Sequence, residues 1–189
     1  MSRSSTPVPR SLRRRLERAL GEEHVITDPA RLTAYESDAL TTTRGTPRAA
    51  LFPGDADELS EVLRLLHDAD VPFVPRGSGT GLAGGAIARD AALVSTVRLN
   101  RILELDPGAR AAWVEPGVVT DEISAAAAAH GLRYLPDPAS GSTCTIGGNV
   151  ATNAGGPHCL RDGVTADHVL ALELALPDGR RVALDRGAD

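Results

Sequence analysis

Residues 71–85 read Val71-Pro-Phe-Val-Pro-Arg-Gly-Ser-Gly-Thr-Gly-Leu-Ala-Gly-Gly85, a short apolar run followed by a loop with five glycines. The apolar run, Val71 to Val74, predicts a buried strand. Glycine permits positive φ and lets a ligand approach the backbone without a Cβ in the way. Successive backbone N–H groups in such a loop can form an anion-binding concavity. We therefore expect the loop to hold a diphosphate; the alternative is a flexible surface loop.

The same loop contains Gly79-Thr-Gly-Leu-Ala-Gly84, which matches the G-x-G-x-x-G pattern of Rossmann dinucleotide sites. That fingerprint requires the glycines to open a helix inside a β-α-β unit. Here Ala91 to Thr96 already predicts the next strand, and the gap is too short for a crossover helix. We therefore reject a Rossmann site and a nicotinamide-dependent dehydrogenase. The phosphate is expected on a loop between strands, held by backbone amides.

The residues before the loop predict a strand, a helix and a strand. Ala49 to Phe52 is an apolar strand ended by Pro53-Gly54. Asp55-Ala-Asp-Glu58 resembles a capping box, and the helix after it carries one apolar stripe and ends near Asp70. The stripe consists of Leu59, Val62, Leu63 and Leu66. This portion is a β-α-β unit, whose parallel crossover should be right-handed.

The N-terminal residues predict a tail and two short helices. Residues 1–9 are rich in Ser and Pro and are expected to be disordered. Ser11 to Leu20 has helical apolar spacing with Arg on its other faces, which favours a surface helix over a transit peptide. Asp28-Pro29 predicts the N-cap and first residue of a helix running to about Ala34.

The residues after the loop predict further strands and a helix. Ile102 to Leu105 and Ala111 to Val114 are expected to form a hairpin. A helix from Glu122 to His130 follows, capped by Thr120 or Asp121 and ended by Gly131. The last pair of strands is predicted at Val169 to Leu176 and Arg181 to Leu184, joined by a turn at Pro177-Asp-Gly179.

A second unusual segment runs from Leu135 to Gly156 and holds many small or hydroxyl residues and almost no charge. It cannot build a core from large side chains. It can line a flat aromatic ligand and offer it hydroxyls, amides and backbone N–H groups. A long irregular loop is the alternative; such loops are uncommon in compact domains and are often functional.

Composition narrows the class of protein. The 189 residues suit one domain or slightly more. Aromatic residues make up 3% and the net charge is −5, so no nucleic-acid surface is expected. Cys144 and Cys159 lack metal-ligand spacing, so no metal is expected, and free thiols are favoured over a disulfide. No apolar run approaches the length of a membrane span.

The two glycine-rich segments, with the residues between and after them, resemble one family. It is the FAD-binding domain of the vanillyl-alcohol-oxidase-type flavoproteins, and the chain is most similar to the FAD-linked subunit of glycolate oxidase and the related D-lactate and D-2-hydroxyacid dehydrogenases. The match covers about Tyr35 to Leu184. The segments that carry it are Val74 to Gly85, Val114 to Gly117, Pro136 to Pro138, Cys144 to Asn149, Thr152 to Gly156 and Leu172 to Gly179.

The resemblance implies an α+β fold of the FAD-binding PCMH type. Residues 1–34 would form an N-terminal tail with helices, and 35–189 an incomplete FAD-binding domain. Within it, 47–106 would be a small α/β subdomain, packed on a second mixed or antiparallel sheet subdomain that starts at 107, with FAD between them. Family members continue well past this point, so the C-terminal part is expected to be missing.

The resemblance also implies the cofactor-binding residues. They are Pro75, Arg76, Gly77, Ser78, Gly79, Thr80, Gly81, Leu82, Pro138, Thr145, Gly148, Asn149, Asn153 and Val169. The residues from Arg76 to Leu82 would wrap the FAD diphosphate with backbone amides. Those from Pro138 to Asn153 would lie along the ribityl chain and isoalloxazine, and Val169 would lie beside the adenosine half. Thr80 stands where covalent members carry a His, so FAD is expected to be non-covalent.

The activity implied is oxidation of a small 2-hydroxy acid, such as glycolate or D-lactate, to the 2-oxo acid by hydride transfer to FAD. The alternative is a catalytically incomplete module that needs a partner chain or the missing part. An iron–sulfur electron-transfer subunit, and a cytoplasmic location with peripheral attachment to the inner membrane through a partner, are also implied. No catalytic residue is assigned; His158, just after the second segment, is a hypothesis for acid–base work.

Overall fold

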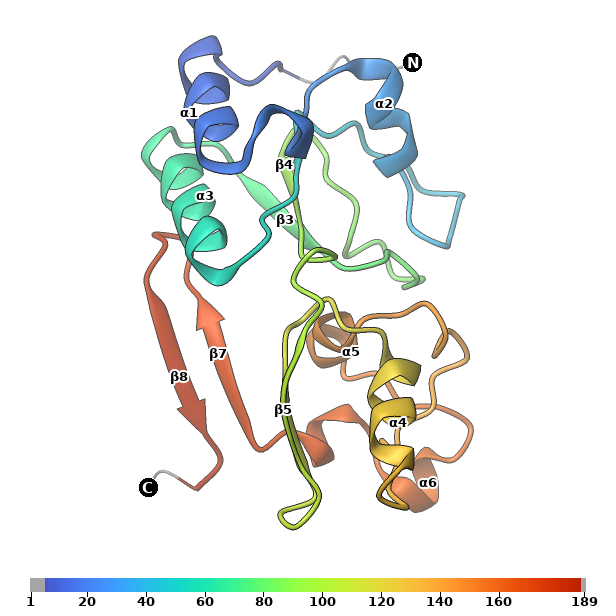
Figure 1. Ribbon diagram of the computed structural model, residues 1–189. Coiled ribbons are helices and arrows are strands. Elements are labelled where there is room, and N and C mark those ends of the chain that lie inside the picture. The colour runs from blue at the N-terminus through green and yellow to red at the C-terminus, as the bar shows by residue number, and fades with distance from the viewer. Residues whose placement is uncertain (1–5, 188–189) are drawn as a thin grey trace.

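The computed structural model describes residues 6–187. Its first part is built on a four-stranded sheet with the order β1-β2-β4-β3 (Figure 1). The strands are β1 (Val25–Ile26), β2 (Ala49–Leu51), β3 (Phe73–Arg76) and β4 (Ala92–Ser95). The last three are parallel, and β1 is antiparallel at one edge. Every residue of β2 and β4 is buried, as expected for central strands of a parallel sheet.

Two helices cover part of this sheet and complete the larger core. In α1 (Arg10–Leu20) the buried side chains are Leu12, Leu16 and Leu20, and in α3 (Ala56–Asp68) they are Val62, Leu63, Leu65 and Leu66. These side chains share one hydrophobic cluster, and the two helices lie side by side in Figure 1. The apolar face of α1 therefore packs in the core, and most of its Arg side chains face solvent. This agrees with the predicted surface helix.

The helix caps follow the sequence closely, with one difference in detail. The Glu58 N–H donates to Asp55 Oδ1 at 2.8 Å, as predicted for the N-cap of α3. The Glu58 carboxylate accepts from the Gly54 N–H, not from Asp55, so the capping box is not reciprocal. Asp28 caps α2 (Pro29–Leu32), which continues as a 3₁₀ turn, η2 (Thr33–Tyr35), and not as an α-helix to Ala34. A further 3₁₀ turn, η1 (Glu22–His24), follows α1.

The second part contains two antiparallel hairpins and a group of helices. The hairpins are β5 (Ile102–Asp106) with β6 (Ala111–Val114), and β7 (Ala171–Ala175) with β8 (Arg181–Asp185). Each pairs only within itself among the described residues, so the antiparallel strands form two small sheets. The turn between β7 and β8 packs on α3: a Cβ on Gly179 would lie 2.5 Å from the Ser60 carbonyl oxygen. Arg181 also pairs with Asp57 at 3.0 Å.

Several boundaries differ from the sequence prediction. The strand expected from Val71 begins at Phe73, and the strand expected from Val169 begins at Ala171. Helix α4 (Thr120–Ala128) begins before Glu122, so the predicted cap at Thr120 or Asp121 is wrong. The Val119 N–H donates to the Glu122 carboxylate at 3.3 Å. The Thr120 side chain is buried inside the helix start and accepts from Asn149 Nδ2. The helix also ends earlier than predicted, at Ala128 and not at His130, and Gly131, with φ +68°, lies in the turn that follows it.

The sequence prediction also missed helical turns in the second small-residue segment and beyond it. They are α5 (Ile146–Thr152), α6 (Cys159–Asp162) and a 3₁₀ turn, η3 (Thr165–His168). Helices α4, α5 and α6 gather on one side of the β5–β6 hairpin in Figure 1. Both cysteines are free thiols, as favoured from sequence. Of the residues 1–9 that were expected to be disordered, 1–5 lie outside the described residues. The expectation is wrong for 6–9, because Val8 is buried in the larger core and the Thr6 N–H donates to Asp90.

Among residues 6–187, every helix is too short or too polar to cross a bilayer. The same residues hold no group of three potential metal-ligating His, Cys, Asp or Glu side chains.

An ion pair between Arg48 and Asp90 joins two segments that are distant in the sequence, and it makes the stability of the fold depend on pH. Arg48 donates from Nε and Nη2 to the two carboxylate oxygens of Asp90, each at 2.9 Å, and the Thr6 N–H adds a third hydrogen bond. These bonds, Arg48 first, lower the pKa of Asp90 to about 2 from an ordinary value of 3.8. A depressed folded-state pKa stabilises the fold above the unfolded value, and the stabilisation is lost as the pH falls towards the folded value.

We therefore expect Asp90→Asn to lower the melting temperature near neutral pH, and the deficit to shrink as the pH falls from about 4 towards about 2. Thermal melts of both proteins across this range measure it. Glu104→Gln is the control, since its carboxylate makes no hydrogen bond in residues 6–187. A deficit that stays constant with pH would contradict the role of Asp90.

Candidate cofactor-binding site

The glycine loop, residues 77–85, joins the end of β3 to the segment that leads into β4 and contains no helix. This confirms that it is not the helix-opening loop of a Rossmann site. Among residues 6–187, the backbone N–H groups from Gly77 through Ala83 find no hydrogen-bond acceptor. Backbone amides rarely lack an acceptor unless water or a ligand supplies one. The loop therefore presents a run of free donors at the end of β3, the edge strand that pairs in parallel with β4.

The second small-residue segment lies directly against this loop. Ser78 Oγ donates a hydrogen bond to the Thr143 carbonyl oxygen. A Cβ on Gly77 would overlap Thr145 Oγ1, so glycine is required there for the two segments to touch. The predicted proximity of these two distant segments is confirmed. The contacts between them are made by backbone atoms and side-chain hydroxyls.

Thr145 is the residue at the centre of this contact. It is 3% exposed, and its Oγ1 has no hydrogen-bond partner in the described part of the chain. A buried hydroxyl without a partner costs free energy of about 1–3 kcal/mol. A Cβ on Gly148 would lie 3.3 Å from the same oxygen, so glycines flank it on two sides. A donor of this kind, beside free loop amides, fits the oxygen atoms of a diphosphate or polyol chain.

The two asparagines of this segment hold the local structure. Asn149 is buried, and its Nδ2 donates to Thr120 Oγ1 at 2.8 Å, which ties α5 to α4. Asn153 ends α5 in the left-handed region with φ +48°, where Asn is tolerated, and its Oδ1 accepts from the Ala166 N–H at 2.9 Å. Both side chains are thus already committed to the fold.

Arg76 faces away from the contact between the segments. Its guanidinium donates to the carbonyl oxygens of Ser37, at 2.9 Å, and Ala86, at 3.3 Å. Burial lowers the pKa of Arg76, and the charge of Asp38 partly opposes this. The Arg76 side chain therefore braces the loop from behind.

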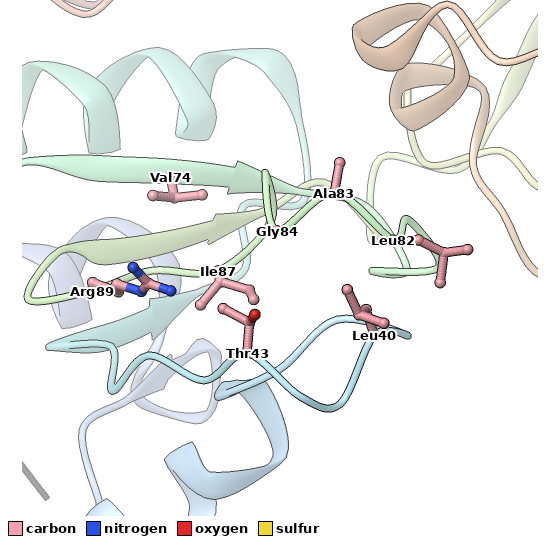
Figure 2. Close-up of a pocket in the computed structure, with 8 residues that line it drawn as sticks. All are labelled: Leu40, Thr43, Val74, Leu82, Ala83, Gly84, Ile87 and Arg89. Carbon is pink, nitrogen blue, oxygen red and sulfur yellow. The ribbon is translucent and has the colours of Figure 1, made fainter. Parts of the chain in front are cut away.

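A cavity of about 560 Å³ lies on the other side of the loop (Figure 2). Leu40 and Thr43 come from the segment before β2, and Leu82, which is 65% exposed, comes from the loop. Its other lining residues are Val74, Ala83, Gly84, Ile87 and Arg89. Its size is in the range of ligand pockets. Most of its lining residues are apolar, but the larger share of the wall surface is polar.

Val169 lines a different cavity, of about 350 Å³, with Val150 of α5 and Leu184 of β8. The predicted residues are therefore divided between two places. Gly77, Ser78 and Thr145 meet at the contact described above, whereas Val169 lies beyond α5. The segment that links the two places is α5 itself, because Val150 follows Asn149 in that helix.

Two further features were not assigned from the sequence. Asp38, in a polar stretch without a motif, is buried and accepts the Gly84 N–H at 2.8 Å. No sequence signal separates it from the other acidic residues of the polar loops. His158 Nδ1 pairs with the Asp137 carboxylate, next to Pro138, and both side chains are partly exposed.

Comparison with known proteins agrees with this geometry. Residues 47–185 match the family model described as FAD binding domain. The chain is 41% identical to the glycolate oxidase subunit GlcD of Escherichia coli K12 over 174 residues, which is 92% of this chain and 34% of that protein. It is 38% identical to D-lactate dehydrogenase of Archaeoglobus fulgidus over 139 residues, which is 71% of this chain and 31% of that protein.

Solved structures share the fold. Alkyldihydroxyacetonephosphate synthase superposes with a TM-score of 0.84 at 21% identity, covering 99% of this chain and 37% of that one. p-Cresol methylhydroxylase gives 0.76 at 17% identity, covering 92% and 34%. These neighbours confirm the α+β fold of the vanillyl-alcohol-oxidase type. The chain spans about a third of the length of the curated relatives it matches.

The family match covers the glycine loop, the second segment and the hairpin that ends in β8. The free loop amides and the unpartnered Thr145 hydroxyl suit the diphosphate and polyol of a flavin dinucleotide. The chain therefore belongs to the FAD binding domain family, and its cofactor is FAD.

Proposed function

We propose that the chain is the FAD-binding portion of a flavin-dependent oxidoreductase that oxidises a small 2-hydroxy acid to the 2-oxo acid. The proposal that the chain binds FAD is supported by the contact between the glycine loop and Thr145. Backbone N–H groups and a hydroxyl without hydrogen-bond partners in the described residues lie close together there. The substrate class is supported by the names of the relatives, glycolate oxidase subunit and D-lactate dehydrogenase. Residues 35–189 would form the FAD-binding domain, with its subdomains divided near Asp106.

In this proposal, each part of the site has a separate task. The amides of Gly77 to Ala83 bind the negative diphosphate, and Thr145 Oγ1 donates to an oxygen of the cofactor. Glycines 77 and 148 keep side chains out of the space around that hydroxyl. Flavin, when bound, supplies the acceptor for the hydride of the substrate. Thr80 stands where covalent members carry a His, so the cofactor is held without a bond to the protein.

The second candidate function is an incomplete FAD-binding module that needs another chain to work. Its support is the apolar surface of the second part. Among the described residues, β5–β6 and β7–β8 each pair only within themselves, and Leu103, Trp113 and Leu184 are exposed. Edges and apolar faces of this kind favour association. An iron–sulfur subunit as partner, and a cytoplasmic location with peripheral membrane attachment, belong to the proposal through the family resemblance.

One experiment tests the function. The purified chain is expected to take up FAD in a one-to-one ratio, and denaturation is expected to release all of the flavin into the supernatant, because the binding is non-covalent. Its visible absorption spectrum before and after denaturation measures both. Reduction of a dye with glycolate or D-lactate then separates a complete enzyme from the incomplete module. A chain that takes up no FAD would contradict the proposed function.

His158 remains a hypothesis for acid–base work: its Nδ1 pairs with the Asp137 carboxylate, and its side chain is exposed. Turnover of the complete enzyme with His158→Ala tests this role, and unchanged turnover would dismiss it.

A further inference from the structure

The glycine loop is held from behind by a segment that precedes the matched family domain. Asp38 lies in this segment and is only 6% exposed. Its Oδ1 accepts the Leu40 N–H at 2.9 Å, and its Oδ2 accepts the Gly84 N–H at 2.8 Å. Burying a carboxylate is costly unless it is hydrogen-bonded and its charge is compensated. The two hydrogen bonds stabilise the buried carboxylate, and the one from Gly84 links it to the distant glycine loop.

Two more contacts join the same segment to the loop. The Ala39 N–H donates to the Gly79 carbonyl oxygen at 3.0 Å. The Arg76 guanidinium donates to the carbonyl oxygens of Ser37 and Ala86, so it bridges the segment and the end of the loop. In a planar trans peptide the C=O and the following N–H point in opposite directions. Holding the Gly79 carbonyl towards Ala39 therefore turns the Thr80 N–H towards the other side.

The charges of this brace do not oppose an anion in front of the loop. A carboxylate near a diphosphate would repel it. Here the half-buried Arg76 guanidinium lies behind the same loop, and the charges of Asp38 and Arg76 interact favourably. The pair thus fixes the loop through two charged groups while adding almost no net charge to it.

We propose that Asp38 is a positioning residue, which holds the glycine loop in its diphosphate-binding conformation before the cofactor arrives. Asp38 precedes residue 47, where the family match begins, so FAD affinity depends on residues outside that match. The inference rests on the proposed FAD site for its ligand. The hydrogen bond to Gly84 and the brace formed with Arg76 stand on the geometry of the protein alone.

The test compares Asp38→Asn and Asp38→Ala with the unchanged chain. Asn has one acceptor oxygen in place of two, so it can serve the Leu40 N–H or the Gly84 N–H but not both, and Ala can serve neither; both variants are expected to raise the Kd for FAD, Asp38→Ala by about tenfold. Riboflavin, which lacks the diphosphate, should bind all three proteins equally. Asp106→Asn is the matched control, because Asp106 also accepts two backbone N–H groups, those of Gly108 and Ala109, in a turn far from the loop.

Hydrogen exchange of the ligand-free protein makes the test independent of FAD. The Gly84 amide should exchange slowly in the unchanged chain although it lies in no helix or strand, and faster in Asp38→Asn. Equal FAD affinity and equal exchange in all variants would overturn the proposal. If the unchanged chain binds no FAD, the proposed function fails while the exchange result still decides the role of Asp38. If neither variant folds, rapid exchange of Gly84 in the unchanged chain would overturn it.

Discussion

Replacing Gly77 with alanine is expected to weaken FAD binding by about 100-fold, because overpacking of this kind costs about 1–3 kcal/mol. The new Cβ would overlap Thr145 Oγ1. Thr145 cannot turn aside easily, since it is buried and β-branched, and rotation would bring its methyl group towards the same space. The two segments must therefore move apart, and the hydroxyl loses its place beside the loop amides.

Titration of the ligand-free protein with FAD, followed by flavin fluorescence, measures this loss. Gly85→Ala is the matched control at the end of the same loop: its Cβ meets nothing within 4 Å and its φ is not positive. It should change the Kd by less than about twofold. A second variant, Gly77→Ala with Thr145→Ala, removes the overlapping oxygen and should recover the affinity of Thr145→Ala alone. Unchanged affinity in Gly77→Ala would contradict the shared site.

Replacing Thr145 with valine is expected to separate cofactor affinity from stability. Valine keeps the β-branched shape and removes the Oγ1 that has no partner within residues 6–187. The ligand-free chain should be as stable as the unchanged protein or more stable, since a buried hydroxyl without a partner is lost. FAD affinity should fall about 30-fold, since a hydrogen bond to a charged group is worth roughly 2 kcal/mol.

Chemical unfolding of the ligand-free proteins and FAD titration measure the two effects. Thr145→Ser is the control that keeps the hydroxyl, and it should retain most of the FAD affinity. A loss of stability without a loss of affinity would show that the hydroxyl serves the fold and not the cofactor.

Much of the fold was predictable because the relevant signals are local. Asp55 and Asp28 cap the helices that their neighbours predict, since an N-cap depends on a few adjacent residues. The turn at Pro177-Asp-Gly179 carries its own chemistry, with φ +84° at the glycine. The glycine loop was recognised as a loop without a helix because the next strand begins so soon after it.

Helix α5 shows where local signals fail. Its residues, Ile146-Gly-Gly-Asn-Val-Ala-Thr152, include two glycines, which are poor helix formers. Distant contacts hold it: Gly147 donates to the Pro116 carbonyl oxygen at 2.8 Å and Ile146 to Val118 at 2.9 Å. A Cβ on Gly147 would lie 2.9 Å from that Pro116 oxygen, so the residue that weakens the helix is the one that permits this contact.

Local residue patterns were therefore sufficient for α1, α3 and α4, for the strands from β2 to β8, for the hairpin turns and for the glycine loop, but not for β1, α5 or α6. Folding in three dimensions was needed to bring Thr145 against Gly77 and to place Asp38 behind Gly84. The reason is physical. Propensities, caps and turns act within a few residues, whereas an overlap avoided by a missing Cβ, or a carboxylate that accepts a distant N–H, exists only when remote parts of the chain pack together.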